Sequence, residues 1–356
     1  MKLFKCNHCG QTLFFENNVC EKCKYPLGFE IQELKLLPLV KQEEELFTIY
    51  NKPKSTQYKY CANHAHDVCN WLVPADNDSP FCVACSLNRT IPDLSKPSYV
   101  ERWKAIEVAK HRLVFSLLQM KLPVFSKAVD QETGLSFDFV ADENEDKSKR
   151  ILTGHANGLI TLNIAEADDI EREMARKAMD ELYRTVLGHF RHEVGHYYWD
   201  RLIDNTEHLE EFRQLFGDEQ EDYGEALKKH YAQGPPADWN QHYISAYATS
   251  HPWEDWAETW AHYLHIMDTL QTASAFRLSI HPEVAKEADH LEADLTEDPY
   301  KLSDFTTIMN MWLPLTFTMN SLNRSMGLHD PYPFIIYPEV MQKMAFIHRV
   351  CDRAKS

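Results

Sequence analysis

The segment from His192 to His196 reads His-Glu-Val-Gly-His and places two imidazoles four residues apart. On a helix, residues at this spacing lie above one another on one face, so both imidazoles can reach one zinc ion at roughly 2.0–2.1 Å. Glu193 lies beside them, where its carboxylate can take a proton from a zinc-bound water. The pattern predicts a catalytic zinc site with His192 and His196 as ligands and Glu193 as general base.

The residues around this motif predict an amphipathic helix. Apolar side chains fall on one stripe of a helical wheel: Leu187, Phe190, Val194, Tyr198 and Leu202. His192, Glu193 and His196 lie on the opposite side. We expect the apolar stripe to pack into the core and the polar side to open to a cleft, as a catalytic helix requires.

A catalytic zinc needs a third protein ligand, because three ligands leave the fourth position open for water. Metzincins continue the motif with a glycine and a third histidine, but Trp199 and Leu202 occupy those positions here. A downstream helix offers two acids instead, Glu254 and Glu258, which are four residues apart and share a face. Spacing alone does not decide which of them binds zinc.

This second helix has its own start signals. Pro252 suits the first turn, and Ser250 or His251 can cap it. The predicted buried stripe comprises Trp253, Trp256, Trp260, Leu264 and Met267. His262 and His265, on the same helix, are interpreted as neighbours with partners of their own rather than as ligands.

Here the chain resembles a known group of enzymes, the glutamate-zincins (gluzincins), and most closely the catalytic domain of lethal-factor toxins. Those proteins follow the HExxH helix with a tyrosine seven residues before a ligand glutamate in a Glu-aromatic-aromatic-Ala-Glu run. Tyr247 lies seven residues before Glu254 in this sequence. The run itself reads Glu-Asp-Trp-Ala-Glu, so it departs from the family pattern at Asp255.

The resemblance implies a role for each matching residue. Glu254 would be the third zinc ligand and Glu258 the acid that orients a ligand. Tyr247 would stabilise the oxyanion. Asp200, four residues after His196, matches an acid in the family and would orient that histidine.

Over nearly its full length the chain is similar to bacterial zinc-binding metallopeptidases that carry an N-terminal zinc-ribbon domain. The likeness rests on the paired cysteines, Cys-Asn-Trp-Leu at 69–72, Asn-Arg-Thr-Ile-Pro at 88–92, residues 192–200, and Asn323-Arg324. It implies an α+β, helix-rich fold, in which a zincin-like catalytic domain follows small zinc-ribbon modules.

Eight of the nine cysteines lie in the first 95 residues, and the first four of these form two close pairs. Cys6 and Cys9 make one C-x2-C turn, and Cys20 and Cys23 make another. Each turn aims two thiolates at one point, so together they complete a tetrahedron around a structural zinc. His8 lies inside the first turn and is interpreted as a bystander.

A looser set follows, and it again predicts a structural zinc: Cys61, Cys69, Cys82 and Cys85. His64 or His66 could replace one of these cysteines as a ligand. Both sets are closed, with four protein ligands, so they stabilise the fold or present a binding surface and do not hydrolyse a substrate. Cys351 stands alone and is interpreted as a small buried hydrophobe.

Composition limits the class of protein. With 356 residues, 44% of them hydrophobic, the chain can bury a large core. The net charge of −17 opposes binding to a phosphate backbone, so we expect no general affinity for nucleic acid. No apolar run is long enough for a membrane span, and the N-terminus lacks the apolar core of a secretion signal. We therefore expect a cytoplasmic protein, whose paired cysteines bind metal.

Four regions are expected along the chain. Residues 1–30 form a zinc ribbon and residues 55–95 a second four-cysteine module. A connecting helix covers 98–121, because apolar residues recur there at helical spacing and Pro123 ends the pattern. Residues 122–345 form the peptidase domain, which is helix-rich with one clear strand, Leu159–Ile164, after the turn Asn157-Gly158.

These observations predict a zinc metallopeptidase with one catalytic and two structural zinc ions. The substrate would be a peptide or protein, bound by strand addition along Leu159–Ile164 if this strand is a sheet edge. A zinc amidase acting on a non-protein substrate would use the same ligands. Two other interpretations remain open. The first is a zinc-scaffolded binding protein with a vestigial HExxH motif, whose zinc ribbons hold a protein partner. The second is a protease that its zinc ribbons guide to nucleic acid, which the net charge opposes.

Overall fold

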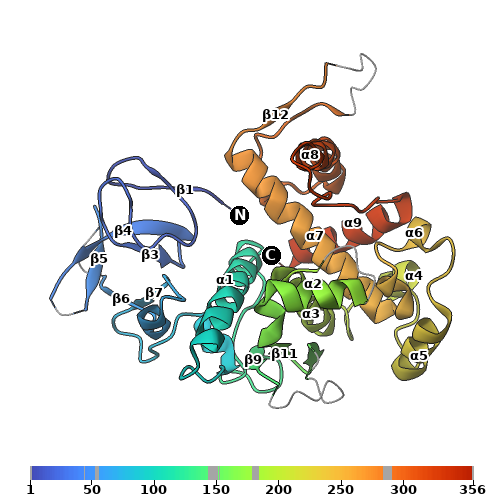
Figure 1. Cartoon of the computed structure of the whole chain (residues 1–356), viewed down its shortest axis with the longest axis horizontal. Coiled ribbons are helices and arrows are strands. Elements are labelled where there is room, and N and C mark those ends of the chain that lie inside the picture. Colours follow the sequence, from blue (N-terminus) through green and yellow to red (C-terminus); the bar gives the residue numbers. More distant parts are fainter. Residues whose placement is uncertain are drawn as a thin grey trace. The chain divides into compact units, whose positions relative to one another are not determined.

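A computed structural model describes residues 2–43, 45–52, 56–142, 151, 153–178, 184–283 and 291–354 (Figure 1). Contacts between Cα atoms divide the chain into two compact units. The first comprises residues 1–119 and 123–172, and the second comprises residues 120–122 and 173–356. None of the described helices is long and apolar enough to cross a membrane.

The first unit begins with a short hairpin and continues with an antiparallel sheet. The hairpin pairs β1 (Phe4–Lys5) with β2 (Thr12–Leu13). Five strands then pair in chain order: β3 (Leu27–Glu30), β4 (Lys35–Lys41), β5 (Phe47–Ile49), β6 (Tyr58–Tyr60) and β7 (Leu72–Pro74). Phe29 and Trp71 are buried and pack with ring centroids 4.6 Å apart. This sheet was not predicted from the sequence, because its strands are short and lie between the cysteine pairs.

Helix α1 (Pro97–Gln119) runs close to the predicted bounds of 98–121. Two short 3-10 helices precede it, η1 (Ala62–His66) and η2 (Cys85–Leu87). Trp103, Ile106 and Leu113 are fully buried on α1, as their helical spacing predicts. A second sheet of four strands belongs to the same unit, in the order β10 (Gly154–Ala156), β11 (Leu159–Asn163), β9 (Ser136–Val140) and β8 (Asn88–Thr90). This sheet is followed by η4 (Ile164–Ala167) and α2 (Asp169–Ala178).

The strand predicted at Leu159–Ile164 forms as β11, but it is not a sheet edge. β11 pairs in parallel with β9 on one side and antiparallel with β10 on the other. Asn157 and Gly158 both have positive φ, 48° and 75°, so the turn signal closes a tight hairpin that lays β10 along β11. The expectation that a peptide adds to β11 is therefore wrong, because both of its backbone edges are already paired.

The second unit is mostly helical. Two long helices lie at its centre, α3 (Val186–Leu202) and α7 (Pro252–Ala275). Around them are α4 (Leu209–Phe216), α5 (Tyr223–Gln233), α6 (Trp239–His242), η5 (Tyr247–Ser250), β12 (Ser279–Ile280), β13 (Ala293–Asp294), η7 (Pro299–Lys301), α8 (Phe305–Ser325) and α9 (Pro338–Arg353). In Figure 1, α7 is the long orange helix.

Helices α3 and α7 approach closely because a glycine stands at their contact. A Cβ atom on Gly195 would lie 3.1 Å from the Cα of Ala257 and 3.2 Å from Cδ1 of Trp260. Trp256 donates its indole N–H to the Gly195 carbonyl over 2.9 Å, and Tyr198 stacks on Trp260 with centroids 5.2 Å apart. The absence of a Cβ atom at Gly195, the fourth residue of the HExxH motif, thus lets α7 bring its own residues to the two histidines.

Candidate active site and metal centres

The motif helix α3 begins at Val186. The hydroxyl oxygen of Thr185 caps it by accepting a hydrogen bond from the Gly188 N–H over 2.9 Å. The two histidines then lie well inside the helix, four residues apart. Both face α7, and the distance between their Nε2 atoms is 3.2 Å.

Helix α7 begins at Pro252, as predicted. Of the two residues that could cap it, His251 is the cap, because its Nδ1 accepts the N–H of Trp253 over 3.0 Å. Glu254 therefore sits in the first turn, where its backbone is fixed by the cap. Trp256, Trp260, Leu264 and Met267 are buried as predicted, whereas Trp253 packs its ring against His196 at a centroid distance of 3.9 Å.

The two histidines and Glu254 form a triangle of donor atoms. Oε2 of Glu254 lies 3.1 Å from His192 Nε2 and 3.4 Å from His196 Nε2. Ligands of a tetrahedral zinc at roughly 2.0–2.2 Å are separated from one another by roughly 3.3–3.6 Å. The same three residues form one of the metal-binding groups among the described residues. The spacing of this triangle fits a single zinc ion.

The chemistry of the triangle also fits a cation. Oε2 of Glu254 is buried and has no hydrogen-bond partner among the described residues, a costly state for a carboxylate oxygen unless a metal binds it. Burial opposes ionisation of Glu254, but the adjacent imidazoles, His196 first, outweigh it and hold the pKa well below its usual range. The carboxylate is therefore ready to bind metal. Three ligands leave a fourth position for water.

Glu258 does not face the triangle. Its Oε1 accepts a hydrogen bond from His192 Nδ1 over 2.7 Å, and its Oε2 accepts the hydroxyl of Ser245 over 2.6 Å. A proton on Nδ1 leaves the lone pair of Nε2 for a metal. This geometry favours Glu254 over Glu258 as the ligand, and it gives Glu258 the orienting position that the resemblance implied.

Glu193 is buried next to the two histidines, with 8% of its surface exposed. Burial raises the pKa of Glu193, while the charges of His192 and His196 act to lower it. Such a carboxylate accepts a proton more readily than an exposed one. Its surroundings suit a general base.

Tyr247 opens the 3-10 helix η5, and its ring centroid lies 6.1 Å from that of His192. Burial and the nearby charge of Glu254 raise the pKa of Tyr247, so the phenol is neutral and can donate a hydrogen bond. Its position beside the triangle is compatible with the oxyanion role that the resemblance implied.

Sequence reasoning missed two residues of this site, Tyr223 and Ser245. The hydroxyl of Tyr223, at the start of α5, donates to Glu254 Oε1 over 2.6 Å. Ser245 holds Glu258 as described above, and its oxygen also accepts the N–H of Ala248 over 3.1 Å. Neither residue lies in a recognisable spacing from the motif, so no sequence signal could have selected them.

The other predicted neighbours are placed differently. Asp200 is exposed, and the described hydrogen bonds include none between it and His196, so its orienting role stays a prediction. His262 hydrogen-bonds through Nδ1 to the hydroxyl of Tyr332 over 2.9 Å. His265 accepts a hydrogen bond from Arg191 at Nδ1 over 3.5 Å.

The polar face of α3 is less open than predicted. Only 4% of His196 and 8% of Glu193 are exposed, because α7 packs along this face and Trp253 covers His196. The helical wheel could not show this, since it describes one helix without its neighbours. The prediction of a face that opens to a cleft was therefore wrong for these two residues.

The four cysteines of the first set converge. The Sγ atoms of Cys6 and Cys23 are 3.7 Å apart, and those of Cys9 and Cys20 are 3.6 Å apart. Thiolates bound to one tetrahedral zinc at about 2.3 Å are separated by roughly 3.8 Å. His8 packs its ring against that of Tyr25, with centroids 4.5 Å apart, and it is not a member of this metal-binding group.

The second set also converges, with four cysteines and no histidine: Cys61, Cys69, Cys82 and Cys85. Backbone N–H groups point to their sulfur atoms, including that of Cys82 to Cys61 over 3.4 Å. His64 bonds to the Cys69 carbonyl through Nδ1 over 2.8 Å, and His66 packs against Trp103. Neither histidine takes the place of a cysteine.

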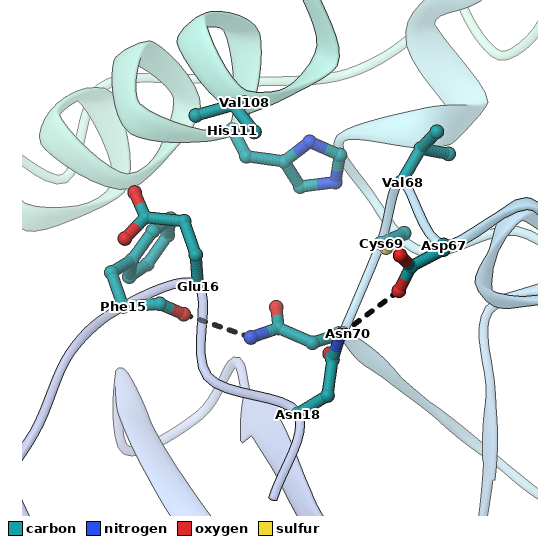
Figure 2. A pocket seen from close by; sticks show the side chains of 9 residues that line it. All are labelled: Phe15, Glu16, Asn18, Asp67, Val68, Cys69, Asn70, Val108 and His111. Carbon is teal, nitrogen blue, oxygen red and sulfur yellow. Dashed lines mark hydrogen bonds between the residues drawn. The ribbon is translucent and has the colours of Figure 1, made fainter. Parts of the chain in front are cut away.

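A histidine from α1 lies at the edge of this second set. His111 Nε2 is 3.7 Å from the Cys85 sulfur, and its Nδ1 hydrogen-bonds to the Glu107 carbonyl over 2.7 Å. A small pocket of about 60 Å³ lies beside it, and Figure 2 shows the His111 ring pointing into this pocket. Asn70 crosses this pocket and donates to the Phe15 carbonyl over 2.8 Å. The hydrogen bonds of Asn70 to the carbonyls of Phe15 and Asn17 thus join the two cysteine modules beside this pocket.

Two four-cysteine sets and one His-His-Glu set define a zinc-binding protein. The chain belongs to the putative zinc-binding metallo-peptidase family, whose sequence profile matches residues 99–350, and a zinc-ribbon domain profile matches residues 3–96. Uncharacterized proteins of Mycobacterium bovis and Mycobacterium tuberculosis are 42% identical over 355 residues, which is 99% of this chain and 96% of theirs. No solved structure matches the chain.

Proposed function

We propose that the protein is a zinc-dependent metallopeptidase of the gluzincin type, with residues 122–345 as its zincin-like peptidase domain. The observation that carries the proposal is the triangle of His192, His196 and Glu254. Within it, the buried Oε2 of Glu254 lacks a hydrogen-bond partner among the described residues. The family assignment supports the same reaction class. The two cysteine sets would each hold a structural zinc.

Zinc, when bound by these three residues, would supply a Lewis acid that polarises the scissile carbonyl and lowers the pKa of a water. Glu193 takes a proton from the attacking water and passes it to the departing amine as the C–N bond breaks. Such general acid–base catalysis contributes roughly 10²–10⁴ in rate. The hydrolysis yields a carboxylate and an amine.

Three residues position or stabilise the reacting groups. Tyr247 donates a hydrogen bond to the carbonyl oxygen as negative charge develops there, an effect of about 10²–10³ in rate per donor. Glu258, held by Ser245, keeps His192 in the tautomer that leaves Nε2 free to bind metal. These assignments rest on the geometry around the triangle and on the resemblance to glutamate-zincins.

A peptide-library digest tests the proposal. Wild type should cleave members of the library, and Glu193→Gln should bind the same amount of zinc but cleave none, because Glu193 is the base and not a ligand. Tyr231→Phe, at an exposed position of α5, is the matched control and should cleave as wild type does. Equal cleavage by wild type and Glu193→Gln would refute the mechanism. An inactive wild type with a full catalytic site would favour a non-peptide substrate or a vestigial site.

A further inference from the structure

The two oxygens of Glu254 have different partners. Oε2 faces the imidazole nitrogens at 3.1 and 3.4 Å, whereas Oε1 accepts the hydroxyl hydrogen of Tyr223 over 2.6 Å. A carboxylate can bind zinc through one oxygen or through both. The phenol engages Oε1, so Oε2 is the oxygen that faces the imidazole nitrogens and has no hydrogen-bond partner among the described residues.

The start of helix α5, which carries Tyr223, is tied to the start of α7. His251 accepts the Trp253 N–H at Nδ1 over 3.0 Å, so its proton sits on Nε2, which donates to the Glu221 carbonyl over 3.1 Å. The same imidazole therefore caps α7 and holds the chain two residues before Tyr223. The Tyr223 ring packs beside His251 at a centroid distance of 5.3 Å.

A second tie fixes the first turn of α5 itself. The Asp222 carboxylate accepts the N–H of Glu225 over 2.9 Å and caps the helix. The Tyr223 ring also contacts Trp253, the residue next to Glu254, at 6.0 Å. The capped first turns of α5 and α7 thus place Tyr223 beside Glu254.

We propose that Tyr223 is a positioning residue, which holds Glu254 to single-oxygen coordination through Oε2 and so keeps the fourth zinc position open for water. The inference rests on the proposed function and adds a residue that neither the motif nor the family resemblance supplied. Tyr223 acts through Glu254, and Tyr247 remains the donor to the oxyanion. The two tyrosines of the site therefore have different roles.

The test measures metal affinity and ligand geometry rather than activity alone. Co²⁺ is titrated into the full chain, with zinc retained in both cysteine sets, in competition with a graded chelator. Tyr223→Phe should weaken metal binding at the triangle about 10–100-fold, as is typical when a residue that orients a ligand is removed. It should also change the visible Co²⁺ absorption, because Glu254 is then free to bind through both oxygens.

Two other tyrosines serve as controls. Tyr247→Phe should leave Co²⁺ affinity within about twofold and lower only turnover, because its proposed role is to donate to the oxyanion and not to hold a zinc ligand. Tyr231→Phe, 74% exposed on the same helix, should change neither property. The Tyr223 ring is itself 39% exposed and the substitution removes one oxygen atom, so the variant should fold, which circular dichroism checks.

The outcomes separate this inference from the proposed function. Unchanged Co²⁺ affinity and spectrum in Tyr223→Phe would overturn it, and a loss of turnover without any change in metal binding would make Tyr223 a substrate contact instead. If wild type binds metal at the triangle but cleaves no peptide, the proposed function fails. The effect of Tyr223→Phe on metal binding can still be measured in that case.

Discussion

At the scale of single residues, the site distinguishes two glutamates that the sequence could not. Both lie on α7, four residues apart, and both approach His192, but from opposite sides of its ring. Glu254 reaches the metal-facing nitrogen and Glu258 the outer one. The distinction depends on the side-chain directions of two packed helices, which spacing along one helix does not determine.

This difference gives a ranking of variants. Glu254→Gln should weaken the catalytic zinc most, because it removes the charge of a ligand. Glu258→Gln should weaken it less, by about 10–100-fold, because it loosens only the orientation of His192. Glu193→Gln should leave zinc affinity nearly unchanged. Competition with a graded chelator measures the order, and a weaker site in Glu258→Gln than in Glu254→Gln would move the ligand along the helix.

At the scale of elements, the sequence predicted the helices better than the strands. Helices α1, α3 and α7 carry long apolar repeats and clear start signals, so their positions could be predicted. Strands β3–β9 are three to seven residues long, and β9 was missed because its alternating Ser-Phe-Asp-Phe-Val is too short to stand out. The failed prediction that β11 is a sheet edge depended on β10, a three-residue strand that pairs with β11 and has no sequence signal of its own.

The residues of the candidate site were predictable only where they form a local sequence pattern. His192, Glu193 and His196 lie in one helical turn and form a local pattern. Tyr223 and Ser245 come from elements whose approach to α7 is fixed by tertiary contacts, such as the hydrogen bond from His251 to the Glu221 carbonyl. Long-range contacts of this kind leave no periodicity in the sequence.

The packing of α7 against the segment that joins α8 to α9 gives a pH prediction. Tyr332 and Phe334 of this segment cover His262, which burial holds neutral with its pKa lowered from 6.5 to about 4, while Glu258 acts to raise it and Arg191 to lower it. The unfolded chain binds a proton near pH 6.5 and the folded chain does not. This histidine's contribution to stability is therefore complete above pH 6.5 and is lost as the pH falls toward 4.

Between pH 7 and pH 5, the loss from this one group amounts to roughly 2 kcal/mol. His262→Gln removes the titrating group, so its free energy of unfolding should fall less over this interval than that of wild type. Urea unfolding at the two pH values measures the difference. His329→Gln, at an exposed position of the same unit, is the control. An equal decrease in the free energy of unfolding in wild type and in His262→Gln would contradict the account.

At the scale of the whole molecule, the two cysteine sets and the proposed catalytic site belong to different units. Both cysteine sets lie in the first unit, and the His-His-Glu set lies in the second. Because a closed zinc site contributes folding free energy, Cys85→Ser should lower stability and remove one zinc ion while leaving the catalytic groups in place. Cys351→Ser, at a buried cysteine outside both sets, should retain every zinc ion.

The zinc content of the purified full-length chain tests the central claim most directly. Elemental analysis of wild type should give three zinc ions per chain, and Glu254→Gln should give close to two once weakly held metal is removed by brief dialysis against a chelator. Glu193→Gln should keep all three. Two zinc ions in wild type, with both cysteine sets filled, would contradict the account, because the triangle of His192, His196 and Glu254 would then not be a metal site.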